Sequence, residues 1–390
     1  MTSLRPILGL SFAHLVTDLY TPVIPAILPL LILQNGFSYV MAGLFITVFQ
    51  LTSSFVQPLT GWLYDTRGTA VNVSVSILLS AVCISSIGLL SDYRAILLCA
   101  ALGGLGHALF HPAALGTVSK LVEDQSRGRL TSYFVVGGNF GFAVGPVVAG
   151  ALVGLFGLQG ICLLVIPGLI TAAALRLFLP QPTWTPRDET GAGSVLKSSS
   201  VRSAIVLVVA GSAFRSWAIF GSIAFLPTLL IARDMTLIAA NTLVSLMLLA
   251  GVFGQLFGGT VSDRYGRKEY TLFGLVASAP FFLIFLQSSG LISYIALLLF
   301  GFFLWSTFSV TLAMAHELVP GNSGLISGLM LGFAVGTGGA GVAVTGLLAD
   351  TLGLEQGFTL LILPVAAAFL IFLLAPYPLR LLRNRNYQKS

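Results

Sequence analysis

The sequence predicts an all-α membrane protein with twelve transmembrane helices in two pseudo-symmetric six-helix bundles. Three observations lead to this prediction: the composition, the number of long apolar runs and an internal repeat. Of the 390 residues, 56% are hydrophobic and only 8% are charged, whereas a soluble domain carries about 25% charged residues. So few charges cannot cover a water-facing surface, and the bilayer is the expected solvent. In lipid the backbone must satisfy its own polar groups, so long apolar runs are expected to be helices.

Twelve apolar runs are long enough to cross a bilayer, which takes about 20 residues in a helix. Charges, Gly, Pro or polar clusters separate these runs, which cover residues 6–33, 39–63, 70–90, 94–119, 129–155, 159–179, 202–231, 238–262, 270–288, 291–315, 323–349 and 356–377. The first run is longer than the core of a signal peptide, so we expect it to be an uncleaved first span.

The distribution of positive charge predicts the orientation. An even number of spans puts both termini on one side. Of the 19 Lys and Arg residues, Arg215 lies within a span and Arg94 and Arg233 lie on the opposite side, which leaves 16 on the side of the termini. Positively charged loops stay in the cytoplasm, so we expect cytoplasmic termini. The net charge of +6 then follows from topology, and no nucleic-acid partner is expected. Short loops favour a bacterial plasma membrane.

The longest polar segment divides the chain into two halves. It covers residues 180–201 and is rich in Pro, Ser, Thr and Gly, which is typical of a linker. We therefore expect an N-terminal bundle over residues 1–179 and a C-terminal bundle over residues 202–390.

The two halves repeat each other at a shift of 198 residues. This shift places "GWLYDTRG" (61–68) on "GTVSDRYG" (259–266) and "ILPLLI" (27–32) on "FLPTLL" (225–230). A weaker match joins "GGNFGFAVG" (137–145) to "LGFAVGTGG" (331–339) with a small gap. Duplicated bundles are typical of secondary transporters, in which the substrate binds near mid-membrane.

Several motifs resemble those of the major facilitator superfamily. The stretch "GTVSDRYGRK" (259–268) resembles its loop signature, and "GWLYDTRGTA" (61–70) resembles a degraded first copy. The stretch "GFAVGPVVAG" (141–150) is similar to the span-five signature of proton-coupled drug antiporters, with Ala149 in place of one Gly. Four further stretches together resemble the fosmidomycin-resistance family of exporters: "SFAHLVTDLYTPVIPAILPLL", "FQLTSSFVQPLTGWLYD", "ALFHPAALG" and "RSWAIFGSIAFLP". Common drug exporters carry an Arg before the Gly pair of span four, but here that region reads "CAALGGLGHALFHP" (99–112) and has none, so the role of that Arg is not carried over.

The resemblance implies the major facilitator fold, transport by alternating access and a monomer. It also implies roles for two sets of residues. The cytoplasmic gate would comprise Gly61, Asp65, Arg67, Gly259, Asp263, Arg264, Gly266 and Arg267. The span-five antiporter motif would comprise Gly141, Gly145, Pro146 and Gly150. The gate charges latch one half against the other, or they are solvated loop charges. The glycines of span five form a smooth stripe, which suits either a moving seal or a static close crossing.

Two ionisable residues in span one are the main candidates for proton coupling. Asp18 lies about 18 Å along a helix that begins near Pro6, close to mid-membrane. His14 shares its face, because the two residues are four apart. Ionisable groups at this depth almost always face the bundle interior and are functional by default. Asp18 with His14 is therefore either a proton carrier or a structural pair that braces span one.

Other polar residues within spans are expected to line the substrate cavity. They are Gln50, Gln57, His107, His111, Asn139, Arg215 and Gln255. His107 and His111 lie four apart and could bind a metal, relay protons or simply pack. Span four has no acidic or Cys partner for them, so no metal site and no cofactor are expected. Arg215 falls on Thr17 under the shift of 198 residues, next to Asp18. It would pair with Asp18 or hold an anionic group of the substrate.

Together these features predict a proton-coupled antiporter that exports small toxic or drug-like molecules. A proton symporter that imports a small organic anion is the alternative. An enzyme is not expected, because the sequence has no HExxH, GxSxG or Walker motif and its short loops leave no room for a catalytic domain.

Overall fold

The computed structural model describes residues 4–67, 72–121, 127–178, 199–320 and 326–379. The regular elements of these residues are helices. They are α1 (Leu4–Leu19), α2 (Val23–Asn35), α3 (Tyr39–Arg67), α4 (Val73–Ser86), η1 (Ile87–Leu89), α5 (Tyr93–Leu121), α6 (Arg127–Phe156), η3 (Leu158–Leu164), α7 (Val165–Phe178), α8 (Ser199–Ala232), α9 (Leu237–Tyr265), α10 (Arg267–Gln287), α11 (Gly290–Leu318), η5 (Gly328–Ala334), α13 (Val335–Leu352), α14 (Leu354–Thr359) and α15 (Ile362–Leu374).

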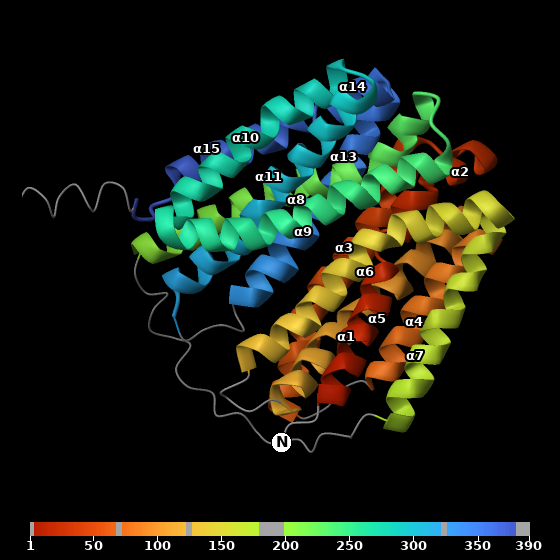
Figure 1. Ribbon diagram of the computed structural model, residues 1–390, viewed down its shortest axis with the longest axis horizontal. Coiled ribbons are helices and arrows are strands. Elements are labelled where there is room, and N and C mark those ends of the chain that lie inside the picture. The colour runs from red at the N-terminus through yellow and green to blue at the C-terminus, as the bar shows by residue number, and fades with distance from the viewer. Residues whose placement is uncertain (1–3, 68–71, 122–126, 179–198, 321–325, 380–390) are drawn as a thin grey trace, which may run out of the picture. The chain divides into compact units, whose positions relative to one another are not determined.

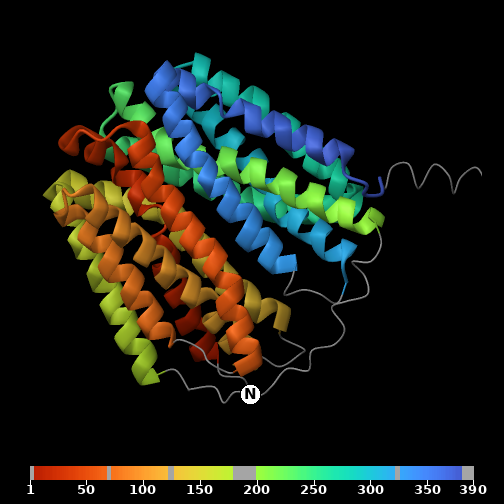
Figure 2. The same cartoon turned by 180° about the vertical axis from the view of Figure 1, so that it is seen from behind.

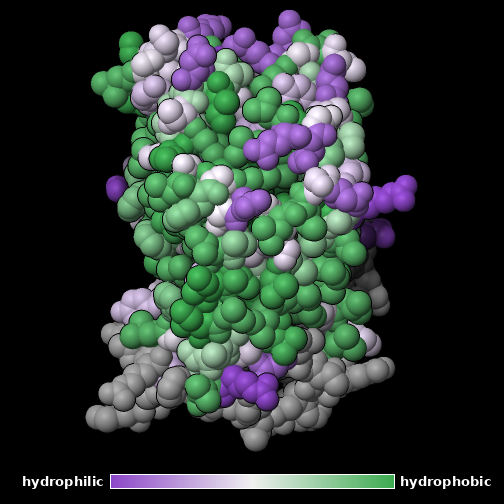
Figure 3. All heavy atoms as spheres, turned by 90° about the vertical axis from the view of Figure 1, so that its right-hand side faces the viewer, coloured by the Kyte–Doolittle hydropathy of each residue, from purple (hydrophilic) through white to green (hydrophobic). Residues whose placement is uncertain are grey.

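The helices confirm the predicted membrane fold. In the described residues, 11 helical segments are long and apolar enough to cross a bilayer, and Val73–Leu89 is a shorter apolar helix in the place of the predicted third span. Hydrophobic residues cover most of the face shown in Figure 3. Large apolar side chains such as Leu177 and Leu374 are more than 70% exposed, as expected for groups that face lipid tails.

The chain forms two compact units. Unit 1 consists of Met1–Asp188 and Ile223–Ser245, and unit 2 consists of Glu189–Ser222 and Leu246–Ser390. The predicted linker, residues 180–201, lies almost entirely outside the described residues. The domain boundaries drawn from the sequence therefore stay a prediction.

Unit 1 is built from pairs of closely packed helices. Helix α1 packs along α6, α3 packs along α5, and α4 packs against both α5 and α7 (Figures 1 and 2). Glycine allows the first of these contacts. A Cβ added to Gly141 would collide with the carbonyl oxygen of Leu15, and one added to Gly145 would lie 2.7 Å from that of Leu19. The stripe expected in span five is thus the surface that receives α1.

The first span is not a continuous helix. Helix α1 ends at Leu19 and α2 begins at Val23. Pro22 and Pro25 have no N–H group to donate, which interrupts the regular hydrogen bonding. Tighter bonds replace it, including Thr21 N–H to the Asp18 carbonyl at 3.2 Å. Asp18 therefore lies in the last turn before the break, and such discontinuous helices surround substrate and ion sites in many transporters.

In unit 2, α10 packs against α11 and α15, and α13 packs against α14. Close contacts within each unit repeat the duplication. The Gly141–Leu15 contact of unit 1 has its counterpart at Gly338, where an added Cβ would lie 2.8 Å from the Ala213 carbonyl oxygen. These contacts are related by shifts of 197 residues (141 to 338) and 198 residues (15 to 213).

The weaker sequence match, 137–145 with 331–339, falls on α6 in one half and on η5 and the start of α13 in the other. Gly338, the counterpart of Gly141 in the contact above, lies within the matched segment. Because η5 is π-helical, its turn is wider than that of an α-helix.

Candidate functional site

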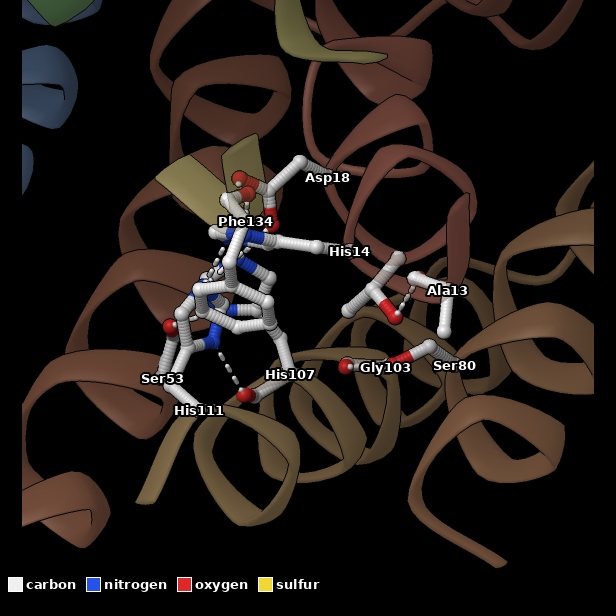
Figure 4. A network of polar contacts seen from close by, with 10 residues as sticks. Ala13, His14, Asp18, Ser53, Ser80, Gly103, His107, His111 and Phe134 are labelled. Carbon is white, nitrogen blue, oxygen red and sulfur yellow. Dashed lines mark hydrogen bonds and ion pairs between the residues drawn. The ribbon is translucent and has the colours of Figure 1, made fainter. Parts of the chain in front are cut away.

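The site in unit 1 is a carboxylate surrounded by three histidines. Asp18 Oδ2 lies 3.1 Å from His14 Nε2. Asp18 Oδ1 lies 3.3 Å from His107 Nε2 and 3.3 Å from His111 Nε2. Figure 4 shows the three imidazole rings gathered below the Asp18 carboxylate. Of the four histidines in the sequence, three therefore meet at one carboxylate.

Each imidazole is also held by its second nitrogen. His14 Nδ1 donates to the Phe134 carbonyl at 2.7 Å, and His111 Nδ1 donates to the His107 carbonyl at 3.0 Å. His107 Nδ1 contacts the Ser53 hydroxyl at 2.7 Å. These contacts direct all three Nε2 atoms toward Asp18. The His14 ring also stacks on Phe134, with ring centroids 4.2 Å apart, so its orientation is fixed by packing as well.

Four elements supply the site, and glycines let them approach. Asp18 and His14 come from α1, Ser53 from α3, His107 and His111 from α5, and Phe134 from α6. Gly138 of α6 lies directly against the cluster, because a Cβ there would collide with His14 Nε2 and lie 2.6 Å from Asp18 Oδ2. On α5, a Cβ at Gly104 would lie 2.5 Å from the Phe49 carbonyl oxygen of α3. The glycine-rich segments of spans four and five thus bring the side chains together.

The tautomers follow from these hydrogen bonds. A backbone carbonyl only accepts, so Nδ1 of both His14 and His111 must carry a proton. In the neutral rings, both Nε2 atoms then present lone pairs, yet they lie 3.2 Å apart and face a carboxylate. Lone pairs at this distance repel unless a cation lies among them. The cluster is therefore built to hold at least one extra positive charge, such as a proton on one imidazole.

The other predicted cavity residues lie on α3, α6 and α9. Gln50 of α3 is 5% exposed, and Gln57 and Asn139 are half-buried. Gln255 of unit 2 is half-buried, and its carbonyl accepts a hydrogen bond from Ser309 Oγ at 3.0 Å. The structure adds Ser53 and Phe134 to the residues predicted from the sequence. Ser53 lies on the same helix as Gln50 and Gln57, whereas a backbone acceptor such as Phe134 leaves no signal in the sequence.

No metal site is expected from the sequence at His107 and His111, because their own span has no acidic partner for them. The structure supplies that partner from span one, since Asp18 and His14 lie beside them. His14, Asp18 and His111 form a group whose ligand atoms all lie within 4.8 Å of one another.

Arg215 is a buried cation of unit 2. Its side chain is 1% exposed. Among the described residues, its Nε and Nη1 atoms have no hydrogen-bond partner. Its guanidinium lies over the Phe308 ring, 5.0 Å from the centroid, which compensates part of the desolvation. The predicted pairing of Arg215 with Asp18 stays a prediction, because the two residues belong to different units.

The second loop signature forms a charge network inside unit 2. Arg267 lies 2.5 Å from Asp263 Oδ1 and 3.1 Å from Glu317 Oε1. Tyr377 donates to the other Glu317 oxygen, and burial beside this carboxylate raises the pKa of the tyrosine. Gly266 adopts φ +111° at the start of α10, a conformation that strongly favours glycine. Arg267 thus has partners within its own half, while the latch between halves stays a prediction.

The remaining gate residues show less constraint. Arg264 lies over the ring of its neighbour Tyr265, 5.5 Å from the centroid. A Cβ added to Gly61 or Gly259 would meet its nearest neighbour at 3.9 Å, an ordinary contact distance. A methyl group at either glycine would therefore not collide with a neighbouring helix among the described residues, and the gate stays a prediction. The side chains of Asp65 and Arg67 lie outside the described residues.

The end of the span-five motif contacts α9 within unit 1. A Cβ added to Gly150 would lie 2.8 Å from Asn241 Cβ. One turn earlier, just after Pro146, the Val147 N–H group donates to Ser245 Oγ at 3.0 Å. The proline leaves α6 as one continuous helix over Arg127–Phe156, and the motif packs on two helices, α1 and α9.

Comparisons with known proteins agree with this architecture. The family model of the Major Facilitator Superfamily matches residues 8–240 and 208–386. The chain is 31% identical over 376 residues to the fosmidomycin resistance protein of Escherichia coli K12, covering 94% of this chain and 92% of that protein. It is 22% identical over 351 residues to the cis,cis-muconate transport protein of Acinetobacter baylyi, covering 84% and 81% of the two chains.

A solved structure has the same fold. The bacterial homologue of the human lysosomal transporter Spinster, solved in an inward-facing and occupied conformation, superposes with a TM-score of 0.84. It is 15% identical to this chain, and the match covers 95% of this chain and 96% of that one.

Proposed function

The chain belongs to the Major Facilitator Superfamily, and from that premise we propose that it is a proton-coupled antiporter that exports small toxic or drug-like molecules. It is a transporter rather than an enzyme. The proposal places it in a bacterial plasma membrane, as a monomer with cytoplasmic termini and with the proton gradient as its only energy source. The bias of 16 to two in loop charges supports this orientation.

The Asp18 cluster is the observation that carries the proton coupling. A carboxylate inside a transmembrane segment is costly unless it has a function or a partner. Here three imidazoles lie within 3.3 Å of it, and the two fixed tautomers require an additional cation. Imidazole and carboxylate exchange protons readily near neutral pH. A proton bound among these four groups on one side of the membrane is released on the other, after the helix break at Tyr20–Pro22 has changed its exposure.

The direction of transport is supported by similarity. The fosmidomycin resistance protein of Escherichia coli is a relative over nearly its whole length, and resistance to a drug is consistent with its export. The span-five stripe of Gly137, Gly141 and Gly145 supports antiport. It closes α6 tightly onto α1 beside the cluster, which limits the leak of protons when no substrate is bound.

Transport in reconstituted vesicles tests the proposal. Proteoliposomes with an internal pH dye and an imposed proton gradient would receive a panel of compounds that includes fosmidomycin. We expect an active compound to dissipate the gradient with the wild type and not with Asp18→Asn, which keeps the shape of the side chain and removes its charge. Equal dissipation by both proteins would make Asp18 structural. If no compound moves protons with the wild type, the export proposal loses its main support.

A symporter that imports a small organic anion is the second candidate. Arg215 favours it, because its buried Nε and Nη1 atoms have no hydrogen-bond partner among the described residues, and a guanidinium is suited to a carboxylate or phosphonate. The relative named as a muconate transport protein also handles an organic anion. The same vesicles distinguish the two candidates: an antiporter moves labelled substrate against the direction of proton flow, and a symporter moves it in the same direction.

A further inference from the structure

Three side chains of the Asp18 cluster, His14, Asp18 and His111, form a triangle in which the two imidazoles contact different oxygens of the carboxylate. His14 Nε2 lies 3.1 Å from Asp18 Oδ2 and 3.2 Å from His111 Nε2. His111 Nε2 lies 3.3 Å from Asp18 Oδ1. Both imidazoles donate from Nδ1 to backbone carbonyls, so both Nε2 lone pairs point into the triangle. Hydrogen bonding between neutral rings does not explain this arrangement, because neither Nε2 has a proton to donate.

The edges have the length expected around a transition metal. Zinc binds His nitrogen at about 2.0–2.1 Å and carboxylate oxygen at about 2.0–2.2 Å. Ligand atoms at the corners of a tetrahedron of that size are separated by about 3.3–3.5 Å. The observed contacts of 3.1–3.3 Å are close to this range, but those to Asp18 end at two different oxygens. Through a single Asp18 oxygen the three ligand atoms lie within 4.8 Å of one another, so a rotation of the carboxylate, or binding through both of its oxygens, would admit the ion.

The surroundings of the triangle are also those of a metal site. A metal-bound histidine usually donates its other ring N–H to a carbonyl or carboxylate, which fixes the tautomer and orients the ring. His14 and His111 both do so, toward the carbonyls of Phe134 and His107. His107 lies outside the triangle, yet its Nε2 reaches Asp18 Oδ1 at 3.3 Å. It is therefore placed to orient the carboxylate rather than to complete the ligand set.

We propose that His14, Asp18 and His111 bind a divalent transition-metal ion such as Zn²⁺. Two imidazoles and one carboxylate suit zinc, cobalt or nickel rather than calcium or magnesium, which require mostly oxygen ligands. Three protein ligands leave a fourth position open, as in catalytic rather than structural zinc sites. The ion would take the place of the extra positive charge that the two tautomers require. This binding does not depend on what the protein transports or in which direction.

Metal titration of the purified protein tests the site without any transport assay. The full chain, purified in detergent without a polyhistidine tag and stripped with a chelator, would be titrated calorimetrically with ZnCl₂. A parallel titration with CoCl₂ would follow visible absorption, which reports the coordination geometry of cobalt. We expect one equivalent to bind to the wild type. His111→Ala should weaken binding by about 100-fold or more, because loss of an outer-shell partner alone costs 10–100-fold.

Two further variants keep the test decisive. Asp18→Asn preserves the shape of the site if His111→Ala does not fold, and it should also weaken binding strongly. His316→Ala removes the only histidine outside the cluster and should leave binding unchanged. The proposal is overturned if the wild type binds no stoichiometric Zn²⁺, if binding survives both cluster variants, or if only His316→Ala removes it.

Discussion

At the scale of single residues, Gly138 controls the geometry of the Asp18 cluster. It has no side chain, and an added Cβ would collide with His14 Nε2 and lie 2.6 Å from Asp18 Oδ2. We expect Gly138→Ala to fold but to lose substrate-driven proton movement, because the methyl group displaces the two groups that share the proton. The proton assay in vesicles would measure this loss.

A matched substitution separates this effect from a general effect of alanine. Gly9 lies on α1, five residues before His14, and an added Cβ there meets nothing within 4 Å. Gly9→Ala should keep both stability and transport. If Gly138→Ala transports at the rate of Gly9→Ala, the precise spacing of His14 and Asp18 is not needed for coupling.

We expect the buried Arg215 side chain to lower the stability of the substrate-free protein and to bind anionic substrates. Burying a charge without a partner is unfavourable. Among the described residues, the Arg215 Nε and Nη1 atoms have no hydrogen-bond partner, and the guanidinium lies over the Phe308 ring. We expect Arg215→Met to raise the melting temperature of the substrate-free protein, by about 2–4 °C for each kcal/mol recovered in a unit of this size. We expect anionic substrates to stabilise the wild type and not this variant. Thermal unfolding with and without substrate measures both effects, and a destabilised Arg215→Met would show that the guanidinium has a structural partner.

At the scale of elements, the crossing of α1 with α6 and its counterpart in unit 2 determine the packing. Both depend on a glycine placed against a backbone carbonyl, Gly141 on Leu15 and Gly338 on Ala213. A backbone atom cannot move aside as a side-chain end can. We expect Gly141→Ala and Gly338→Ala each to destabilise the protein by about 1–3 kcal/mol, the usual effect of overpacking.

Gly259→Ala is the control for these two variants, since its nearest neighbour would be 3.9 Å from the new methyl group. Its melting temperature should stay near that of the wild type. A loss of stability at Gly259 as large as at Gly141 would mean that helix propensity or another contact, rather than the two crossings, determines the effect.

The elements were predictable to different degrees. Long apolar runs gave the spans because their signal is local, and the glycine stripe gave a close crossing in span five. The identity of the partner helix was not predictable, since spacing along one helix does not specify its neighbour. For this reason His14 with Asp18 was predicted on one face, and His107 with His111 on another, but their meeting at one carboxylate was not. The break after Asp18 had its signal in Pro22 and Pro25.

At the scale of the whole molecule, the two halves repeat each other in their helix crossings but not in their ionisable residues. The shift of 198 residues carries His14, Asp18, His107 and His111 to Ser212, Ser216, Trp305 and Ser309, none of which is ionisable near neutral pH. Conversely, Arg215 falls on Thr17. Each half therefore keeps its helix crossings, whereas the Asp18 cluster belongs to the first half and Arg215 belongs to the second.

This asymmetry predicts that the first half binds the proton and the second half binds the substrate. Exchange of labelled for unlabelled substrate across vesicles without a gradient requires substrate binding and reorientation, but no net proton transfer. We expect Asp18→Asn to retain this exchange and to lose transport driven by a proton gradient. Arg215→Gln should lose both activities, because an anionic substrate would no longer be held. Flux of one labelled compound under the two conditions measures the difference, with Gly9→Ala as the unaffected control. If Asp18→Asn abolishes exchange as well, the cluster takes part in substrate binding or reorientation, and the two halves are not specialised in this way.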